Sequence, residues 1–355
     1  MNNNMEKSIR IGSSNIGSDH VPFIIAEAGI NHNGDLKRAL KMVSVAKNSG
    51  ANAIKFQTFK ASEFVANSEL QITYLSQGKK VTESQLEMFR RHEFPIDSWF
   101  KIKAECEQQK IMFLSTPQNR SDLDLLLEIG VRAIKVGSDD FINIPLLKSY
   151  AETGLPLILS CGMSNLSEIY QTLEAVGSLD GYPTILLSCT SQYPTPFKDV
   201  NLLKLKTLSA TFPMVVHGFS DHTQGPLASS VAAALGACCF EKHFTLNHND
   251  PGPDHWFSED PEGLKEWVKA IRNVFDILGS GILRPTHKEE KEKLGGRRSI
   301  LALKNIQKGE MFSSVNIGLR RPGTGLPPVL IEKLLKTKSS RSINEGEMLT
   351  YKDLS

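Results

Sequence analysis

Short apolar runs recur along the first part of the chain, and each run leads into residues with polar side chains. The eight runs lie at 22–26, 53–54, 111–114, 133–134, 155–159, 185–187, 214–216 and 238–240. The segments between them mostly carry apolar residues at helical spacing, so strands and helices are expected to alternate. Eight buried parallel strands of this kind predict a (β/α)8 TIM barrel, a fold of the α/β class.

The polar residues at the ends of the eight runs are expected to meet, because the carboxyl ends of the strands build the active site in such barrels. They include Glu27, Lys55, Gln57, Ser115, Thr116, Lys135, Ser138, Ser160, Ser188, Cys189, Thr190, Ser220, Asp221, His222, Glu241 and His243. A longer polar insertion at 61–94 is predicted to lie over this face as a loop or a helical cap.

The chain is longer than one barrel requires. It has 355 residues, whereas a barrel of this type typically has roughly 250, so a second small domain is expected. We expect a catalytic barrel over 1–280, a linker over 281–296 and a C-terminal domain over 297–355. In that domain the segment 306–312 recurs loosely at 343–349, which indicates two related β-hairpin units.

Composition narrows the classes of function. The formal net charge is only +2, with no long run of one sign, which argues against nucleic acid or a membrane surface as the main partner. The five cysteines show no CxxC spacing and the first residues lack a signal-peptide pattern, so a cytoplasmic protein with reduced thiols is expected. No apolar run approaches the roughly 20 residues of a membrane span.

Two histidines follow neighbouring predicted strands, beside carboxylates. In a strand, Glu241 and His243 point to the same side, and His222 ends the preceding strand. Two neutral imidazoles with oxygen ligands could hold a divalent cation, which would polarise a carbonyl group. The alternative is that both histidines are hydrogen-bonded structural residues.

Two lysines near buried strand ends form a second candidate site. Burying Lys55 and Lys135 is unfavourable unless an anion lies opposite, which predicts a pocket for phosphate and carboxylate groups. The hydroxyl groups that could complete this pocket belong to Thr116, Ser138, Ser160 and Ser220. Two alternatives stay open: a salt bridge to Glu27 or Asp140, and a lysine that forms a Schiff base with its substrate.

A set of motifs follows in order along the chain. They are IAEAGINHNG at 25–34, KFQT at 55–58, STP at 115–117, YPTP at 193–196, SDHT at 220–223, EKHFT at 241–245 and PGPD at 251–254. Together they closely resemble the sialic acid synthase family, whose members make N-acetylneuraminic, legionaminic and pseudaminic acids. The resemblance covers nearly the whole chain, and residues 297–355 are similar to the family's β-rich SAF (antifreeze-like) domain, with RRPGTG at 320–325 as its signature.

The resemblance implies condensation of phosphoenolpyruvate with an N-acylated hexosamine of manno type, with C–O cleavage and release of phosphate. It implies a divalent metal ion, Mn²⁺, with Mg²⁺ or Co²⁺ as alternatives. It also implies a domain-swapped homodimer in which the SAF domain of one chain delivers Arg321 into the barrel of the other.

The resemblance also assigns roles to individual residues. The implied metal ligands are His222 and His243; the catalytic residues are Glu27, Lys135, Asp254 and Arg321; the phosphoenolpyruvate-binding residues are Lys55, Thr116, Lys135, Ser138, Ser160 and Ser220; the sugar-binding residues are Gln57, Tyr193, Asp254 and Arg321. At 137–140 the chain reads Gly-Ser-Asp-Asp where the family usually has Gly-Ser-Gly-Glu, so the role of Asp140 stays open. Gln118 and Cys161 replace a common Phe and Thr.

Two other classes of function stay open. One is a Schiff-base aldolase of the same fold that uses Lys135, and the other is a non-catalytic ice- or sugar-binding protein, suggested by the antifreeze-like tail. The sequence leaves three choices for the sugar: N-acetylmannosamine, its 6-phosphate, or a diacetamido-trideoxyhexose.

Overall fold

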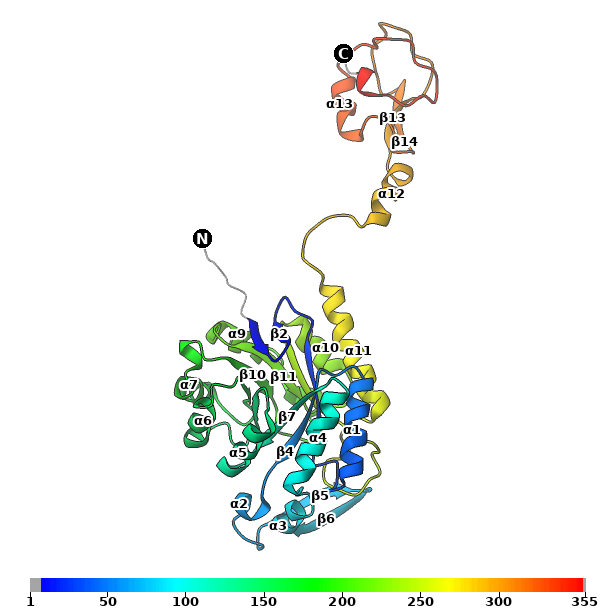
Figure 1. Ribbon diagram of the computed structural model, residues 1–355. Helices are drawn as coiled ribbons and strands as arrows, with labels where there is room; N and C mark the ends of the chain where they lie inside the picture. Colours follow the sequence, from blue (N-terminus) through cyan, green and yellow to red (C-terminus); the bar gives the residue numbers. More distant parts are fainter. Residues whose placement is uncertain (1–7, 354–355) are drawn as a thin grey trace. The chain divides into compact units, whose positions relative to one another are not determined.

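The structure is a computed structural model that describes residues 8–353 (Figure 1). The chain divides after Gly279 into two compact units, and each unit is described by itself. Among the described residues, no helix combines the length and the apolar character that crossing a membrane requires.

The first unit is built around eight parallel strands. They are β3 (Phe23–Gly29), β4 (Ala53–Thr58), β7 (Met112–Pro117), β8 (Ile134–Val136), β9 (Leu157–Ser160), β10 (Thr184–Cys189), β11 (Val216–Asp221) and β12 (Cys239–His243). Hydrogen-bonded neighbours follow the order β7-β4-β3-β12-β11-β10-β9-β8, and β8 also lies beside β7. The sheet therefore curls into a nearly closed barrel, and the predicted (β/α)8 fold is confirmed.

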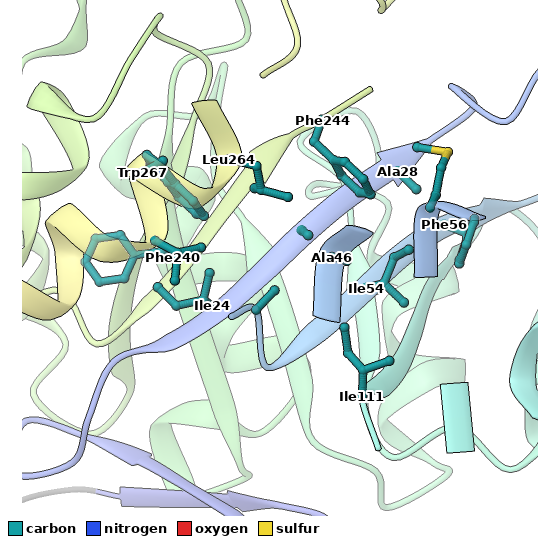
Figure 2. Close-up of a cluster of buried hydrophobic side chains, with 14 of the residues drawn as sticks. Ile24, Ala28, Ala46, Ile54, Phe56, Ile111, Phe240, Phe244, Leu264 and Trp267 are labelled. Atoms are coloured by element: carbon teal, nitrogen blue, oxygen red, sulfur yellow. The ribbon is translucent and has the colours of Figure 1, made fainter. Parts of the chain in front are cut away.

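Helices cover the outside of this barrel (Figure 1). They are α1 (Leu36–Asn48), α4 (Ile96–Gln108), α5 (Arg120–Ile129), α6 (Ile144–Ala151), α7 (Leu166–Ala175), α8 (Phe197–Val200), α9 (Lys204–Thr211), α10 (Leu227–Ala234) and α11 (Pro261–Leu278), with a 3-10 turn, η1 (Ser178–Asp180). Figure 2 shows how strands and helices join: Ile24 and Phe240 of the sheet lie near Leu264 and Trp267 of α11, all of them buried. The outward-facing strand residues therefore anchor the helices, and the alternate residues fill the interior.

A hairpin precedes the barrel and closes one end of its interior. Its strands, β1 (Ser8–Ile11) and β2 (Ser14–Gly17), pair antiparallel. Ile9, Ile11 and Ile16 are buried and pack with interior residues at the amino ends of the barrel strands, including Phe23. The apolar runs do not predict this hairpin, because each of its strands has only four residues.

The insertion after β4 contains α2 (Ala61–Phe64), β5 (Gln71–Ser76), β6 (Lys79–Ser84) and α3 (Gln85–Arg90). β5 and β6 pair antiparallel, so a β-hairpin lies between two short helices where a loop or helical cap was expected. The side chain of Gln77 donates to the carbonyl of Asn249 at 2.9 Å, and Ser76 Oγ accepts from the N–H of Gly252 at 3.1 Å. The insertion is therefore fastened to the loop that follows β12.

The second unit contains α12 (His287–Gly296), β13 (Ser299–Ala302), β14 (Ile317–Arg320), η2 (Pro328–Leu330), α13 (Ile331–Leu334) and η3 (Tyr351–Asp353). The two recurring segments meet, because Ile306 and Ile343 form an antiparallel bridge and both are buried in its core. The expected linker segment includes α12, and the N–H of Gly323 donates to the carbonyl of Leu294 at 2.7 Å.

Candidate active site

A pocket of about 380 Å³ lies at the carboxyl ends of the barrel strands. Its lining comes from all eight strands or the loops directly after them: Glu27, Lys55, Gln57, Thr116, Gln118, Lys135, Gly137, Ser138, Asp139, Ser160, Met163, Cys189, Ser191, Tyr193, Ser220, His222, Glu241 and His243. All the residues to which the resemblance gave a role line it, except Asp254 and Arg321. Of the strand-end residues expected at this face, Ser115, Ser188, Thr190 and Asp221 do not line it. Residues as far apart as Glu27 and His243 therefore come together as the fold predicts.

The inward-facing positions change from apolar to polar along each strand. In β3, Ile25 precedes Glu27, and in β12, Cys239 precedes Glu241 and His243. Because side chains alternate along a strand, each of these sets points to the same side. The same alternation that builds the apolar interior thus delivers charged groups to the pocket.

Four buried charged side chains form a cluster in the pocket. Lys55 Nζ lies 2.9 Å from Glu27 Oε1 and 3.8 Å from Glu241 Oε2, and Lys135 Nζ lies 3.4 Å from Glu241 Oε1. Glu241 thus lies between the two ammonium groups. The salt bridge to Glu27 that the sequence left open is present, whereas Asp140 instead accepts a hydrogen bond from Asn143 at 2.9 Å.

Three of the predicted hydroxyl groups bond to this cluster. Lys55 donates to Thr116 Oγ1 at 3.1 Å, and Lys135 donates to Ser160 Oγ at 2.8 Å. Ser220 Oγ donates to Glu241 Oε1 at 3.1 Å. The hydroxyl group of Ser138 accepts from the N–H of Gly162 at 3.0 Å, which ties the loops after β8 and β9 together.

Burial and neighbouring charges shift the pKa values of the cluster in different directions. Burial raises the pKa of Glu27 to about 7, although Lys55 opposes this shift. Burial alone would also raise the pKa of Glu241, but Lys135, Lys55 and His222 outweigh it and lower that pKa. For Lys55, burial favours the neutral form, yet the two carboxylates prevail and raise its pKa. Near neutral pH, Glu27 is therefore the member best suited to exchange a proton.

The two histidines face each other beside Tyr193. Their ring centroids are 5.5 Å apart, and the ring of Tyr193 lies 4.1 Å from that of His222 and 5.7 Å from that of His243. His222 Nδ1 lies 2.8 Å from the carbonyl of Thr190 and can donate to it, which leaves Nε2 for another partner. The sequence prediction that these histidines share one site is consistent with this geometry.

The two imidazoles fit a divalent cation with open coordination positions. Burial, with His222 nearby, holds the pKa of His243 well below its usual range, so this ring is neutral. Its Nδ1 is buried and has no hydrogen-bond partner among the described residues. Within residues 8–353 no group of three or more His, Cys, Asp or Glu side chains is arranged to hold a metal ion. Substrate or water oxygens would therefore have to complete the coordination of an ion held here.

Asp254 lies outside the pocket lining but next to it. Its Oδ2 is 4.0 Å from His243 Nδ1, and burial raises the pKa of this carboxyl to about 6. The adjoining loop is well fixed, because Asn33 Nδ2 donates to the carbonyl of Pro251 at 2.8 Å and Ser258 Oγ donates to the carbonyl of Asp254 at 2.5 Å. Asp254 is therefore placed beside a histidine of the site.

Among the lining residues, Glu241, Asp139 and Gln118 carry polar side chains that were given no role from the sequence. Glu241 was expected at this face as a strand-end residue, and the alternation of β12 places it on the pocket side. Asp139 lines the pocket where the more distant Asp140 was considered, and Gln118 lines it with a buried Oε1 that has no hydrogen-bond partner among the described residues. Asp139 and Gln118 each lie where the sequence departs from the family pattern. These departures are the feature of the sequence that could have identified them as pocket residues.

Arg321 belongs to the second unit. It follows β14 directly and is exposed. Its delivery into a partner's barrel stays a prediction.

Comparison with known proteins defines the family. The sequence profile of the NeuB family matches residues 42–283, and that of the SAF domain matches residues 297–355. The chain therefore belongs to the NeuB family and carries a C-terminal SAF domain, which confirms the resemblance seen in its motifs.

Relatives with assigned names cover almost the whole chain. N,N'-diacetyllegionaminic acid synthase of Legionella pneumophila is 38% identical and aligns over 95% of this chain and 96% of its own. N-acetylneuraminate-9-phosphate synthase of Homo sapiens is 33% identical over 94% of this chain and 93% of its own. The crystal structure of an N-acetylneuraminic acid synthetase from Leptospira borgpetersenii matches with a TM-score of 0.72 and 35% identity, over 82% of this chain and 96% of that one. These relatives are synthases of different acids, so they leave the sugar open.

Proposed function

We propose that this protein is a nonulosonic acid synthase. It condenses phosphoenolpyruvate and water with the open-chain aldehyde of an N-acylated, manno-type hexosamine and releases phosphate. The observation that supports this most is the pocket in which Lys55, Lys135 and Glu27 face His222 and His243. The synthase names of the relatives support the same class of reaction.

The two lysines are suited to hold phosphoenolpyruvate through its phosphate and carboxylate groups. Each ammonium group is buried, carries a hydroxyl partner and lies within 4 Å of Glu241. Charge-assisted hydrogen bonds to such oxygens are short and strong. Ser138, Ser160 and Ser220 add hydroxyl groups along the same lining.

Glu27 is suited to the step that consumes water. The methylene carbon of phosphoenolpyruvate forms a bond to the aldehyde carbon, the aldehyde oxygen becomes an alkoxide, and positive charge develops at the enol carbon. A water molecule adds there and gives one proton to Glu27, which balances the proton that the alkoxide takes up to become a hydroxyl group. The tetrahedral intermediate then breaks its C–O bond to phosphate, and its remaining hydroxyl proton leaves with the phosphate as the ketone forms. A carboxylate in this position also stabilises the developing positive charge, and a pKa of about 7 suits a general base near neutral pH.

The metal is proposed to be Mn²⁺, with Mg²⁺ or Co²⁺ as alternatives, held by His222 and His243. Such an ion would supply Lewis-acid polarisation of the aldehyde carbonyl. Lys135, Glu27 and the neighbouring hydroxyl groups bind and orient the other substrate, so these residues decide the approach of the two reacting carbons.

The sugar is proposed to be unphosphorylated and to meet Gln57, Tyr193 and Asp254. Within the part of the chain that the structure describes, the Lys and Arg residues that line the pocket are Lys55 and Lys135, and both already face carboxylates. A second phosphate group in the same pocket would therefore lack a cation of this chain's barrel.

The direct test is an assay of phosphate release from phosphoenolpyruvate with N-acetylmannosamine, its 6-phosphate and a diacetamido-trideoxyhexose. We expect release with at least one unphosphorylated sugar, complete loss in excess chelator and best recovery with Mn²⁺. Full activity in excess chelator would contradict the metal, and release only with the 6-phosphate would contradict the charge argument. Borohydride trapping of an imine would favour the Schiff-base alternative.

The domain-swapped homodimer is proposed from the position of Arg321 in the SAF domain. Mixing an inactive Arg321→Ala chain with an inactive Glu27→Gln chain should partly restore turnover, because one site of each mixed dimer receives both working residues. Random pairing makes about half of the dimers mixed, so recovery could reach roughly a quarter of wild type. No recovery despite proven subunit exchange would show that Arg321 does not act in the partner.

A further inference from the structure

A buried ion pair joins the two strands that lead into the histidines of the site. Asp221 in β11 and Lys242 in β12 are register partners, and Lys242 Nζ lies 3.1 Å from Asp221 Oδ2. Each of them directly precedes one of the histidines, His222 and His243. Because successive residues of a strand point to opposite sides, the ion pair lies behind the histidines, away from the pocket that they line.

Both members of this pair are removed from solvent. Lys242 is 2% exposed and Asp221 is 1% exposed, so each charge requires partners inside the protein. Lys242 Nζ also lies 3.6 Å from Glu259 Oε1 and donates a hydrogen bond to the carbonyl of Thr223. One ammonium group therefore ties β12 to the segments that follow both histidine-bearing strands.

The carboxylate of Asp221 is held from its other side. Its Oδ1 accepts from the N–H of Thr223 at 2.8 Å, and its Oδ2 accepts from Ser229 Oγ at 2.6 Å. Ser229 in α10 in turn accepts from Trp267 Nε1 in α11 at 2.8 Å. The ion pair is thus anchored to two of the helices that cover the barrel.

Glu259 extends the same network to the backbone of the site. Its Oε1 accepts from the N–H of Gly225 at 2.8 Å. Its own N–H donates to the carbonyl of His243 at 2.9 Å. The connected residues, called the support network below, therefore fix the chain on both sides of the two histidines. Its members are Asp221, Thr223, Ser229, Lys242, Glu259 and Trp267.

We propose that Lys242, with Asp221 and Glu259, is a positioning residue for the divalent cation. It holds the backbones of the two histidines in a fixed register, so that both imidazoles can reach one ion. The inference rests on the proposed function, which assigns His222 and His243 as the metal ligands. Its physical basis is that residues outside the ligand shell fix ligand orientation, and their loss typically weakens metal affinity by about 10- to 100-fold.

The test is Mn²⁺ binding to the purified full-length chain, measured by the electron paramagnetic resonance signal of free Mn²⁺. We expect Lys242→Met to raise the Mn²⁺ dissociation constant by about 10- to 100-fold. Lys242→Arg, which keeps the charge, should recover part of the affinity. Lys103→Met is a matched control, because Lys103 pairs with Glu107 on α4 and belongs to neither the pocket nor the support network.

A second variant separates positioning from folding. If Lys242→Met unfolds the chain, the double variant Asp221→Asn with Lys242→Met removes both charges of the closer pair, while Glu259 keeps its hydrogen bond from the N–H of Gly225. A folded double variant, judged by its melting temperature, that still binds Mn²⁺ weakly supports positioning. Wild-type affinity in the folded double variant would overturn the proposal. Ser229→Ala, which removes one bond to Asp221, should weaken binding by a smaller factor.

Failure of this inference can be told apart from failure of the proposed function. If His243→Ala abolishes Mn²⁺ binding and Lys242→Met leaves it unchanged, only the positioning role is wrong. If His222→Ala and His243→Ala both bind Mn²⁺ as wild type does, the proposed metal site itself is wrong and the inference falls with it.

Discussion

The two ends of the barrel interior are built by the same eight strands, yet their chemistry is opposite. At the amino ends, Ile11 of the N-terminal hairpin packs on apolar strand residues such as Phe23. At the carboxyl ends, the inward positions carry Glu27, Lys55 and Lys135. Glu27 and Lys135 are each 1% exposed, so these charged groups are about as buried as the isoleucine at 0%.

This difference shows that the residues that mainly stabilise the fold and the residues suited to binding and catalysis lie at opposite ends of the barrel interior. Burial of apolar surface stabilises the fold without demanding any particular partner. Burial of a charge is tolerated only where an opposite charge and hydrogen bonds lie close, as Glu241 does between the two lysines. Changes at the apolar end should therefore alter the free energy of unfolding, and changes at the polar end should alter binding and catalysis.

The largest effect is expected at the apolar end. Replacing Ile11 by Ala should lower the free energy of unfolding by about 2 to 5 kcal/mol, because it removes buried methyl groups and leaves a cavity. The Michaelis constant for phosphoenolpyruvate should stay unchanged, since Ile11 lies at the opposite end of the strands. Chemical denaturation and steady-state kinetics on the same samples measure both quantities.

Ile277→Ala is the matched control, because Ile277 is 80% exposed and its truncation should have little effect on stability. Equal destabilisation by the two changes would contradict the assignment of the hairpin to the barrel core. A large change in the Michaelis constant with Ile11→Ala would show that the two ends are not independent.

The second effect is expected at the polar end. Lys135→Met keeps the apolar stem and removes the charge, so we expect a folded protein that binds phosphoenolpyruvate poorly. A hydrogen bond to a charged group contributes about 1.5 to 3 kcal/mol, which corresponds to roughly a 10- to 150-fold rise in the Michaelis constant. An unchanged constant would exclude Lys135 from the anion pocket.

Lys47→Met serves as a control for this change. Lys47 is an exposed lysine of α1 whose ammonium group donates to the carbonyl of Lys110 at 2.9 Å, outside the pocket. Its replacement should leave the kinetics unchanged. A similar rise in the Michaelis constant in both variants would show an effect of total charge rather than of the pocket.

The sequence predicts the contrast between the two ends in outline. Strand runs that lead into Glu27, Lys55 and Lys135 carry enough information to place these side chains at one face, because strand direction is shared in a parallel barrel. The N-terminal hairpin was missed, since its strands are too short to show a clear period. Pairing of short strands depends on what they pack against, which a local pattern does not contain.

Side-chain partnerships were harder to predict than positions. The sequence offered Glu27 and Asp140 equally as partners of the lysines, yet the structure pairs Lys55 with Glu27 and turns Asp140 toward Asn143. The bridging role of Glu241 also requires β12, β4 and β8, which are not neighbours in the sheet, to bring Glu241, Lys55 and Lys135 together across the barrel. Such choices follow from distances of a few ångströms across the barrel, which no spacing along the chain encodes.

The smallest effect concerns the charge state of Glu27. Its pKa of about 7 lies above the ordinary value because of burial, so the carboxylate needed for the water step is lost as the pH falls below 7. We expect kcat/KM to fall about tenfold per pH unit on this acidic side and to level off above neutrality. In Glu27→Gln any residual turnover should be close to background and should show no such slope. A slope that persists with an apparent pKa near 6 would instead point to Asp254, and Asp254→Asn would test that.

The pH dependence of stability gives an independent check on the pKa of Glu27. A raised folded-state pKa means that the folded protein binds this proton more tightly than the unfolded chain. Ionisation of Glu27 should therefore lower the free energy of unfolding as the pH rises from about 4.5 to about 7. The melting temperature of wild type should fall over this range relative to that of Glu27→Gln, and parallel curves would show that Glu27 titrates at its ordinary value.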